Sequence, residues 1–165
     1  MNTSAPWPDL AEAESRVLKI QTKLHQWAID DGDRRFDDLH NLVCDPAFLV
    51  VGWNRVRGNR GGRSAGVDGV APRSIDAAAE LRFLTELRDD LRSGRFRPLP
   101  VRQRMIPKAN GKLRSLGIPT AGDRVVQASF VNGQLDLPGG GQWFCPVVAN
   151  RVAQWWPVDL PGVIG

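Results

Sequence analysis

The stretch from Arg104 to Gln127, RMIPKANGKLRSLGIPTAGDRVVQ, decides the fold of this 165-residue chain. Two β-prone runs, residues 101–106 and 113–118, flank a short segment that contains Asn110-Gly111. Asn-Gly between such runs favours a type I′ turn, because both residues tolerate the positive φ angles that this turn needs. The sequence therefore predicts an antiparallel β-hairpin with its turn in this segment.

A helix is predicted to begin directly after the hairpin. Pro119 ends the second strand, since proline has no N–H to donate to a neighbouring strand. Thr120, with Asp123 three residues later, resembles a capping box, in which each side chain binds the backbone N–H of the other residue. Val125 and Val126 then give the helix an apolar side.

Four more helices are predicted upstream of the hairpin. The first begins after Pro8, Asp33 caps a short second helix, Asp45 caps the third, and Ser74 caps the fourth, over residues 75–92. Their apolar faces, expected to form the core, are Leu10, Ala13, Val17, Leu24 and Ala28; Phe36, Leu39, Leu42 and Val43; Leu49, Val50, Trp53 and Val56; and Ala77, Leu81, Leu84, Leu87 and Leu91.

Residues 58–70, GNRGGRSAGVDGV, are predicted to form a glycine-rich loop, because five glycines disfavour both a helix and a packed strand. Backbone N–H groups in such a loop can face an anion, and Arg60 and Arg63 add positive charge. The segment is not a P-loop. It is one residue too short, has Arg in place of Lys, and follows a predicted helix rather than a strand.

Charge is distributed unevenly along the chain. Residues 1–50 contain five Lys and Arg against nine Asp and Glu, whereas residues 92–114 contain eight Lys and Arg and no acid. A run of cations is often only a solvated surface, but a cationic hairpin has the shape to hold a polyphosphate or a nucleic-acid backbone. The charge pattern therefore favours binding to a polyanion.

Two sequence blocks resemble the finger region of bacterial group II intron reverse transcriptase–maturases. In that family the pattern I-P-K-x-x-G-K-x-R-x-L-G-I-P-T-x-x-D-R-x-x-Q recurs. The residues of this chain that match it are Ile106-Pro107-Lys108, Gly111-Lys112, Arg114, Leu116-Gly117-Ile118-Pro119-Thr120, Asp123-Arg124 and Gln127. Residues 61–69, GGRSAGVDG, resemble the glycine-rich loop that precedes the finger helix of the family. The resemblance covers roughly residues 7–129.

The resemblance implies an α+β fold in three regions. Residues 1–70 would be the helical N-terminal region with the glycine-rich loop, and residues 71–129 part of the reverse transcriptase fingers, with the antiparallel hairpin and a short helix. Residues 130–165 hold six Gly and four Pro but only three charged residues, and they show no sustained period. An irregular, non-native C-terminal tail is expected there, produced by a frameshift or truncation near Ser129.

The resemblance also implies roles for individual residues. The matching Lys108 and Arg114 would hold the triphosphate of an incoming nucleotide. Contact with an RNA template or intron backbone is expected from Arg60, Arg63, Arg95, Arg97, Arg102, Arg104 and Lys112. Arg124 is expected to pair with a nearby acid or with backbone more than with RNA, and Asp68 to stabilise a turn. Solvent-facing charges remain the alternative for Lys108 and Arg114.

Catalysis by this polypeptide alone is not expected. The family would place an Asp on a strand soon after the helix, and later a Tyr-x-Asp-Asp turn. The chain contains no Tyr, and after Ser129 its only acids are Asp136 and Asp159. Two-metal phosphoryl transfer needs carboxylates that converge on both Mg²⁺ ions. We therefore expect no catalytic residue, metal ligand or cofactor in this chain, although Mg²⁺ is expected for the full-length family.

The remaining motifs exclude several classes of site. His25 and His40 are not spaced for a metal site or a catalytic triad. Cys44 and Cys145 lie a hundred residues apart, which suits neither a disulfide framework nor a zinc site but does suit a reducing cytosol. The sequence shows no secretory signal and no long apolar run, so a cytoplasmic protein without a membrane partner is expected.

Three functions stay open on the sequence. The first is a fragment of an intron-encoded RNA-directed DNA polymerase and maturase, which binds RNA and nucleotide and takes any palm and thumb from elsewhere. The second is a non-catalytic RNA-binding or splicing-accessory protein. The third is an inert remnant of a mobile element that folds only in part.

Overall fold

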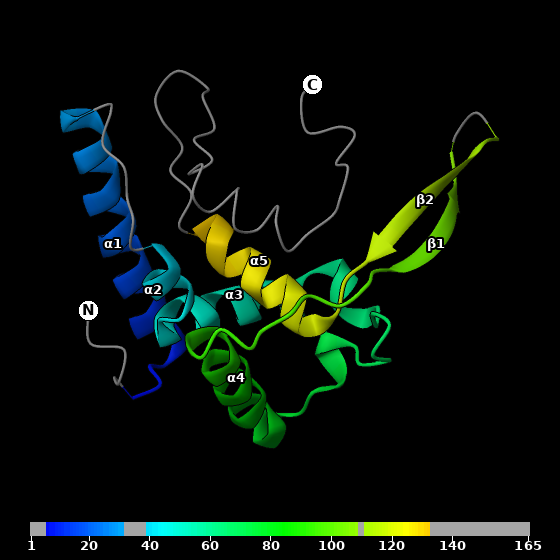
Figure 1. Ribbon diagram of the computed structural model, residues 1–165, viewed down its shortest axis with the longest axis horizontal. Helices are drawn as coiled ribbons and strands as arrows, with labels where there is room; N and C mark the ends of the chain where they lie inside the picture. Colours follow the sequence, from blue (N-terminus) through cyan, green and yellow to red (C-terminus); the bar gives the residue numbers. More distant parts are fainter. Residues whose placement is uncertain (1–5, 32–38, 109–110, 133–165) are drawn as a thin grey trace.

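The computed structural model describes residues 6–31, 39–108 and 111–132, which form a group of helices with a β-hairpin projecting from it (Figure 1). The predicted α+β class is confirmed. The elements are α1 (Leu10–Asp30), α2 (Leu39–Val43), α3 (Pro46–Gly58), the 3₁₀ turns η1 (Arg60–Arg63) and η2 (Pro72–Ser74), α4 (Ala77–Arg92), β1 (Arg102–Pro107), β2 (Leu113–Ile118) and α5 (Ala121–Asn132).

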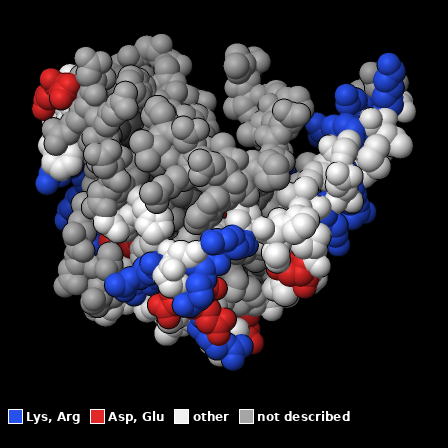
Figure 2. Space-filling model, viewed as in Figure 1, with Lys and Arg blue, Asp and Glu red and all other residues white. Residues whose placement is uncertain are grey.

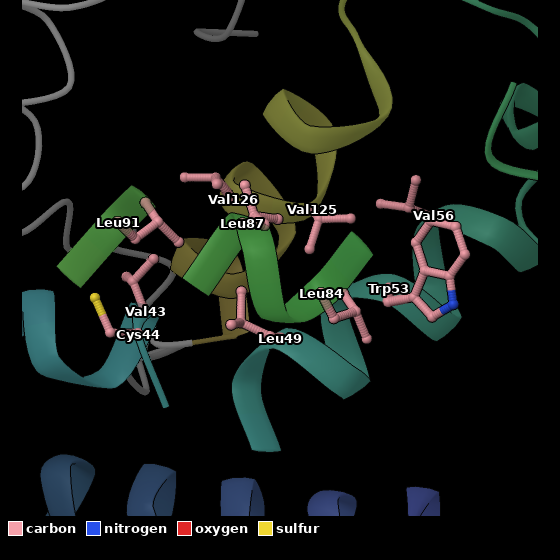
Figure 3. Packing of buried hydrophobic residues seen from close by; sticks show 10 residues of the cluster. All are labelled: Val43, Cys44, Leu49, Trp53, Val56, Leu84, Leu87, Leu91, Val125 and Val126. Carbon is pink, nitrogen blue, oxygen red and sulfur yellow. The ribbon is translucent and has the colours of Figure 1, made fainter. Parts of the chain in front are cut away.

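Helix α3 lies at the centre of the core. Asp45 caps it by accepting a hydrogen bond from the Ala47 N–H at 2.9 Å. Leu49, Trp53 and Val56 are buried, as the sequence predicted. Side chains from the end of α2, from α4 and from α5 close around these three, so the cluster joins four helices (Figure 3). Burial of a Leu, Val or Phe side chain contributes about 1.5 to 3 kcal/mol each.

Helix α1 packs against the other side of α3. A capping box starts it, in which Asp9 accepts from the Glu12 N–H at 2.8 Å and Glu12 accepts from the Asp9 N–H at 3.3 Å. The second core cluster contains Ala13, Val17 and Leu24 of the predicted apolar face, together with Leu42, Ala47 and Phe48. Leu10, which was expected in that face, is instead 37% exposed.

Helix α4 corrects two predictions. Its cap is Asp76, whose carboxylate accepts from the Ala79 N–H at 2.8 Å, whereas the predicted cap, Ser74, donates to the Ala71 carbonyl within η2. Leu81 is 52% exposed and Ala77 is exposed too, so the first two residues of the predicted apolar face are not buried. The later residues Leu84, Leu87 and Leu91 are buried as predicted, and Phe83 packs beside Trp53.

The capping box predicted between Thr120 and Asp123 is confirmed. The Thr120 hydroxyl donates to the Asp123 carboxylate at 2.6 Å, and the Asp123 N–H donates to the same hydroxyl at 3.2 Å. Both residues are buried at the junction between β2 and α5. Farther along α5, Ser129 is 1% exposed and donates to the Phe48 carbonyl of α3 at 3.1 Å. The junction therefore fixes the base of the hairpin to the core.

Several predictions fall outside the described residues. They concern Asp33 as a helix cap, Phe36 in the second helix, the first two residues of the predicted turn segment (109 and 110), and the tail beyond residue 132. The division of the chain at residues 70 and 129 stays a prediction. Among the described residues, no helix is both long enough and apolar enough to cross a membrane.

Candidate nucleic-acid interface

The register of the hairpin places its cations on one face. Arg102 pairs with Ile118, Arg104 with Leu116, and Ile106 with Arg114. The Lys108 N–H donates to the Lys112 carbonyl at 2.7 Å, which extends the ladder by one pair. Directly opposed residues share a face, and residues two apart on a strand share it too. The face that results, called the cationic face below, carries Arg102, Arg104, Lys108, Lys112 and Arg114.

The opposite face of the hairpin is uncharged. It consists of Gln103, Met105, Pro107, Leu113, Ser115 and Gly117. In Figure 2 the hairpin shows a mostly white surface toward the reader, with Lys and Arg atoms at its margins from base to tip. Side chains on both faces are largely exposed, and Met105 and Leu113 are 55% and 59% exposed. The two faces therefore differ in charge rather than in burial.

The register separates the arginines of the cationic face but not its lysines. Each of the three arginines lies directly opposite an apolar residue, whereas Lys108 lies opposite Lys112, an arrangement of like charges that destabilises a sheet unless an anion neutralises it. Gly111 has a positive φ of 76°, and its N–H donates to the Lys108 carbonyl at 3.0 Å. Because Lys108 pairs with Lys112, three residues lie between the paired positions, so the predicted type I′ turn, which has only two, is wrong. Arg102, Arg104, Lys108 and Arg114 form no ion pair with a carboxylate in the described part of the chain. Their charge is thus available to an anion from outside.

The glycine-rich loop is more regular than the sequence predicted. Arg60–Arg63 forms the 3₁₀ turn η1, closed by hydrogen bonds from Gly62 N–H to Asn59 O and from Ser64 N–H to Gly61 O, each 2.9 Å long. A Cβ at Gly62 would lie 2.5 Å from the Arg57 carbonyl oxygen. Tight packing against the end of α3 therefore stabilises a turn that glycine composition alone disfavours.

Arg60 and Arg63 are exposed on η1, as a role in binding requires. The prediction that Asp68 stabilises the loop is confirmed, because its carboxylate accepts from the Val70 N–H at 3.2 Å. Figure 1 shows the segment after α3 beside the base of the hairpin. The two cationic elements named from sequence therefore lie near each other.

Arg124 joins the loop to the hairpin base. Its guanidinium donates to the Pro119 carbonyl at 3.0 Å, to the Gly61 carbonyl at 2.8 Å and to the Ser64 carbonyl. The expectation that Arg124 pairs with backbone is confirmed. Burial lowers the pKa of Arg124 from its ordinary value, and nearby Asp68 and Arg102 act on that pKa in opposite directions. No motif or spacing in the sequence indicates that two of these backbone partners lie sixty or more residues upstream.

Arg95 and Arg97 both have partners within the protein. Arg95 forms an ion pair with Asp90 at 3.0 Å, and Arg97 donates to the carbonyls of Gly94 and Phe96 at 2.7 and 2.8 Å. Both line an open groove of about 380 Å³ beside α4, together with Phe83, Glu86, Leu87, Asp90, Phe96, Leu99, Thr120 and Asp123. With three carboxylates, this groove is less suited to an RNA backbone than the hairpin is.

No group of three or more His, Cys, Asp and Glu residues that could hold a metal ion occurs in residues 6–31, 39–108 and 111–132. Cys44 is buried, and burial raises the pKa of its thiol to about 11. Its Sγ lies 3.8 Å from His40 Nε2.

Comparison with known proteins gives relatives but no family model that matches. Protein YkfC of Escherichia coli (strain K12) is 40% identical over 117 residues, covering 70% of this chain and 30% of that protein. The group II intron-encoded protein LtrA of Lactococcus lactis subsp. cremoris is 30% identical over 112 residues, covering 67% and 18%. A COX1/OXI3 intron 2 protein of Saccharomyces cerevisiae is 27% identical over 124 residues, covering 68% and 14%.

The chain is related in origin to group II intron-encoded proteins. It spans less than a third of the length of the curated relatives that it matches. The match therefore assigns to this chain none of the functions that the unmatched parts of those relatives perform.

Proposed function

We propose that this chain binds single-stranded RNA through the phosphate backbone, using the cationic face of the hairpin and the Arg60–Arg63 turn. The observation that carries the proposal is the hairpin register, which gathers five cations on one face and leaves no acid on either strand. Phosphate contacts of this kind supply affinity but carry no base information. Binding is therefore expected to depend on salt and to be weakly selective for sequence.

Lys108 and Arg114 are proposed to hold a nucleotide triphosphate. Both side chains lie on the cationic face. Lys108 pairs with Lys112, and Arg114 lies two residues beyond Lys112 along the chain. A guanidinium can donate two parallel hydrogen bonds to a phosphate, and an ammonium adds a mobile point charge beside it. Two cations on one face can thus neutralise one phosphate cluster.

We further propose that the chain is the N-terminal part, with partial fingers, of an intron-encoded reverse transcriptase and maturase. The names and low coverage of the relatives and the sequence motifs support this. The polypeptide would not polymerise on its own, because the chain has no Tyr for a Tyr-x-Asp-Asp turn. Sequencing the coding DNA past the Ser129 codon tests the proposed frameshift. The frameshift would be contradicted if none of the three reading frames encoded Tyr-x-Asp-Asp.

RNA binding is tested by fluorescence anisotropy with a labelled uridine homopolymer over a series of KCl concentrations. The expected result is an affinity that falls linearly with salt on logarithmic axes. An affinity that does not change with salt, or no binding at low salt, would contradict the proposal. A variant lacking Arg82, an exposed arginine of α4 outside both cationic elements, controls for loss of charge alone.

Triphosphate binding is tested with a fluorescent nucleoside triphosphate. Replacing Lys108 and Arg114 with Ala should weaken binding more than replacing Arg95 and Arg97, whose side chains already have partners in the protein. Equal effects of the two double variants would argue against a dedicated triphosphate site.

An inert remnant is the competing proposal, and exposed apolar side chains favour it. Leu81, Leu99, Met105 and Leu113 are each about half exposed, at 49% to 59%. Exposed apolar surface promotes aggregation unless a partner covers it. A cooperative melting curve together with salt-dependent RNA affinity would exclude the remnant, and a splicing-accessory role would then be distinguished by acceleration of intron splicing in vitro.

A further inference from the structure

The Arg124 guanidinium uses each of its three nitrogens on a backbone carbonyl. Nε donates to Pro119, Nη1 to Gly61 and Nη2 to Ser64. Two of these carbonyls belong to the glycine-rich loop and the third belongs to the junction at the end of β2. Because the guanidinium is planar and rigid, it fixes the distance between the two elements more firmly than a flexible ammonium could.

A second contact holds the same two elements together. A Cβ at Gly66 would lie 2.7 Å from Thr120 Cα and 2.9 Å from the Pro119 carbonyl oxygen. Real Cβ atoms do not approach backbone this closely, so the loop can dock only because residue 66 is glycine. The loop thus contacts the hairpin base in two places that differ in chemistry.

The loop carries the Arg60–Arg63 turn, and the junction follows directly on the hairpin that carries the cationic face. Arg60 and Arg63 lie on η1, which contains Gly61, a partner of Arg124. Arg102, the first cation of the cationic face, is close enough to lower the pKa of Arg124 by charge repulsion. Arg124 therefore lies between the two cationic elements while its own donors bind backbone.

We infer that Arg124 is a positioning residue that makes the Arg60–Arg63 turn and the cationic face one continuous site for a single RNA strand. This inference rests on the proposed function. When the loop is docked, a strand bound to the hairpin meets Arg60 and Arg63 at high effective concentration. When the loop is released, RNA must order it on binding, and the entropy cost offsets the gain from two phosphate contacts.

A double-mutant cycle tests the inference, with anisotropy of the uridine homopolymer as the readout. Replacing Arg60 and Arg63 with Ala should weaken binding about tenfold near 0.15 M salt, as two lost single-strand phosphate contacts predict. The same pair should cost less than about twofold in the background of Arg124→Ala, where the guanidinium no longer holds the loop at a fixed distance from the hairpin base. Replacing Arg104 and Arg114 should cost the same in both backgrounds, because the hairpin does not depend on the loop.

Gly66→Ala provides a second variant that keeps every charge. Its Cβ would displace the loop from Thr120, so the cost of removing Arg60 and Arg63 should again fall below about twofold. Gly58→Ala is the matched control, since a Cβ there meets nothing within 4 Å, and it should leave that cost unchanged. Far-UV circular dichroism and a melting curve confirm that each variant is folded.

The outcomes separate the inference from the function on which it rests. If the wild-type chain does not bind RNA, the proposed function is wrong. If it binds RNA and removal of Arg60 and Arg63 costs the same with and without Arg124, the positioning role is overturned and the proposed function stands. Retention of the full cost in a folded Gly66→Ala variant would likewise overturn the inference.

Discussion

Moving two positive charges to the other face of the hairpin should weaken RNA binding without changing the composition of the protein. The change is an exchange of neighbours: Gln103→Arg with Arg104→Gln, and Arg114→Ser with Ser115→Arg. Successive residues of a strand point to opposite faces, so each exchange moves one guanidinium from the cationic face to the uncharged face. Net charge, length and residue content are unchanged.

The magnitude follows from the register. Five cations share the cationic face, and each phosphate contact with a single strand contributes about 0.7 to the slope of log affinity against log salt. The cationic face alone thus predicts a slope of about −3.5, and the exchange should reduce its size by about 1.4. With equal affinities of the two proteins at about 1 M salt, this difference in slope makes the exchanged protein bind about tenfold more weakly at about 0.15 M salt.

The assay is anisotropy of a labelled uridine homopolymer titrated with wild-type and exchanged protein across a salt series. Each single exchange, at positions 103 and 104 or at 114 and 115, should give half the change in slope. Circular dichroism controls for loss of the hairpin. If the fully exchanged, folded protein keeps the wild-type slope and affinity, net charge alone drives binding and the argument from one face is refuted.

Three further predictions concern stability. Gly52→Ala should destabilise the protein by about 1 to 3 kcal/mol, because its Cβ would lie 2.8 Å from Ser129 Oγ, whereas Gly58→Ala should be nearly neutral. Urea unfolding compares the two variants, and equal effects would contradict the packing of α3 on α5. Asp123→Ala should lower the free energy of unfolding by about 2 to 3 kcal/mol in the same assay, since it removes a cap and leaves the buried Thr120 hydroxyl without its acceptor. A loss below about 0.5 kcal/mol would refute this role of Asp123. Burial raises the pKa of Cys44 to about 11 from 9.0, so the folded chain keeps a proton that the unfolded chain releases; the stability from this group is present below about pH 9 and is lost as pH rises to about 11. Relative to a Cys44→Ala variant, the wild-type chain should lose about 2 to 3 kcal/mol more over that range, and parallel pH profiles would contradict the assignment.

Local chemistry made the hairpin and three of the helix starts predictable. Asn110-Gly111 located the turn to within a residue, but the predicted type I′ turn would place Lys108 and Arg114 on opposite faces, whereas the observed register places them on the same face. The capping box between Thr120 and Asp123 also follows from residue types at a fixed spacing, because both partners lie within one helical turn.

Predictions failed where distant contacts compete with local preference. Leu81 has the helical spacing of a core residue, yet its side chain is 52% exposed, whereas the neighbouring Glu80 pairs with Arg57 of α3 at 2.8 Å. The glycine-rich loop contains a 3₁₀ turn, because packing of Gly62 on the Arg57 carbonyl compensates for its low intrinsic preference.

The sequence by itself determined the hairpin and its cationic character, because turn chemistry and strand propensity act over a few residues. The folded structure decided the register that gathers five cations on the cationic face, since three residues rather than two lie between the paired Lys108 and Lys112. Only the tertiary structure decided that the Arg60–Arg63 turn lies beside that face. Arg124 reaches carbonyls sixty residues upstream, and Gly66 fits against Thr120, so the placement depends on contacts that form after the helices have packed. No residue spacing encodes such contacts, since they come from the shape of the assembled core.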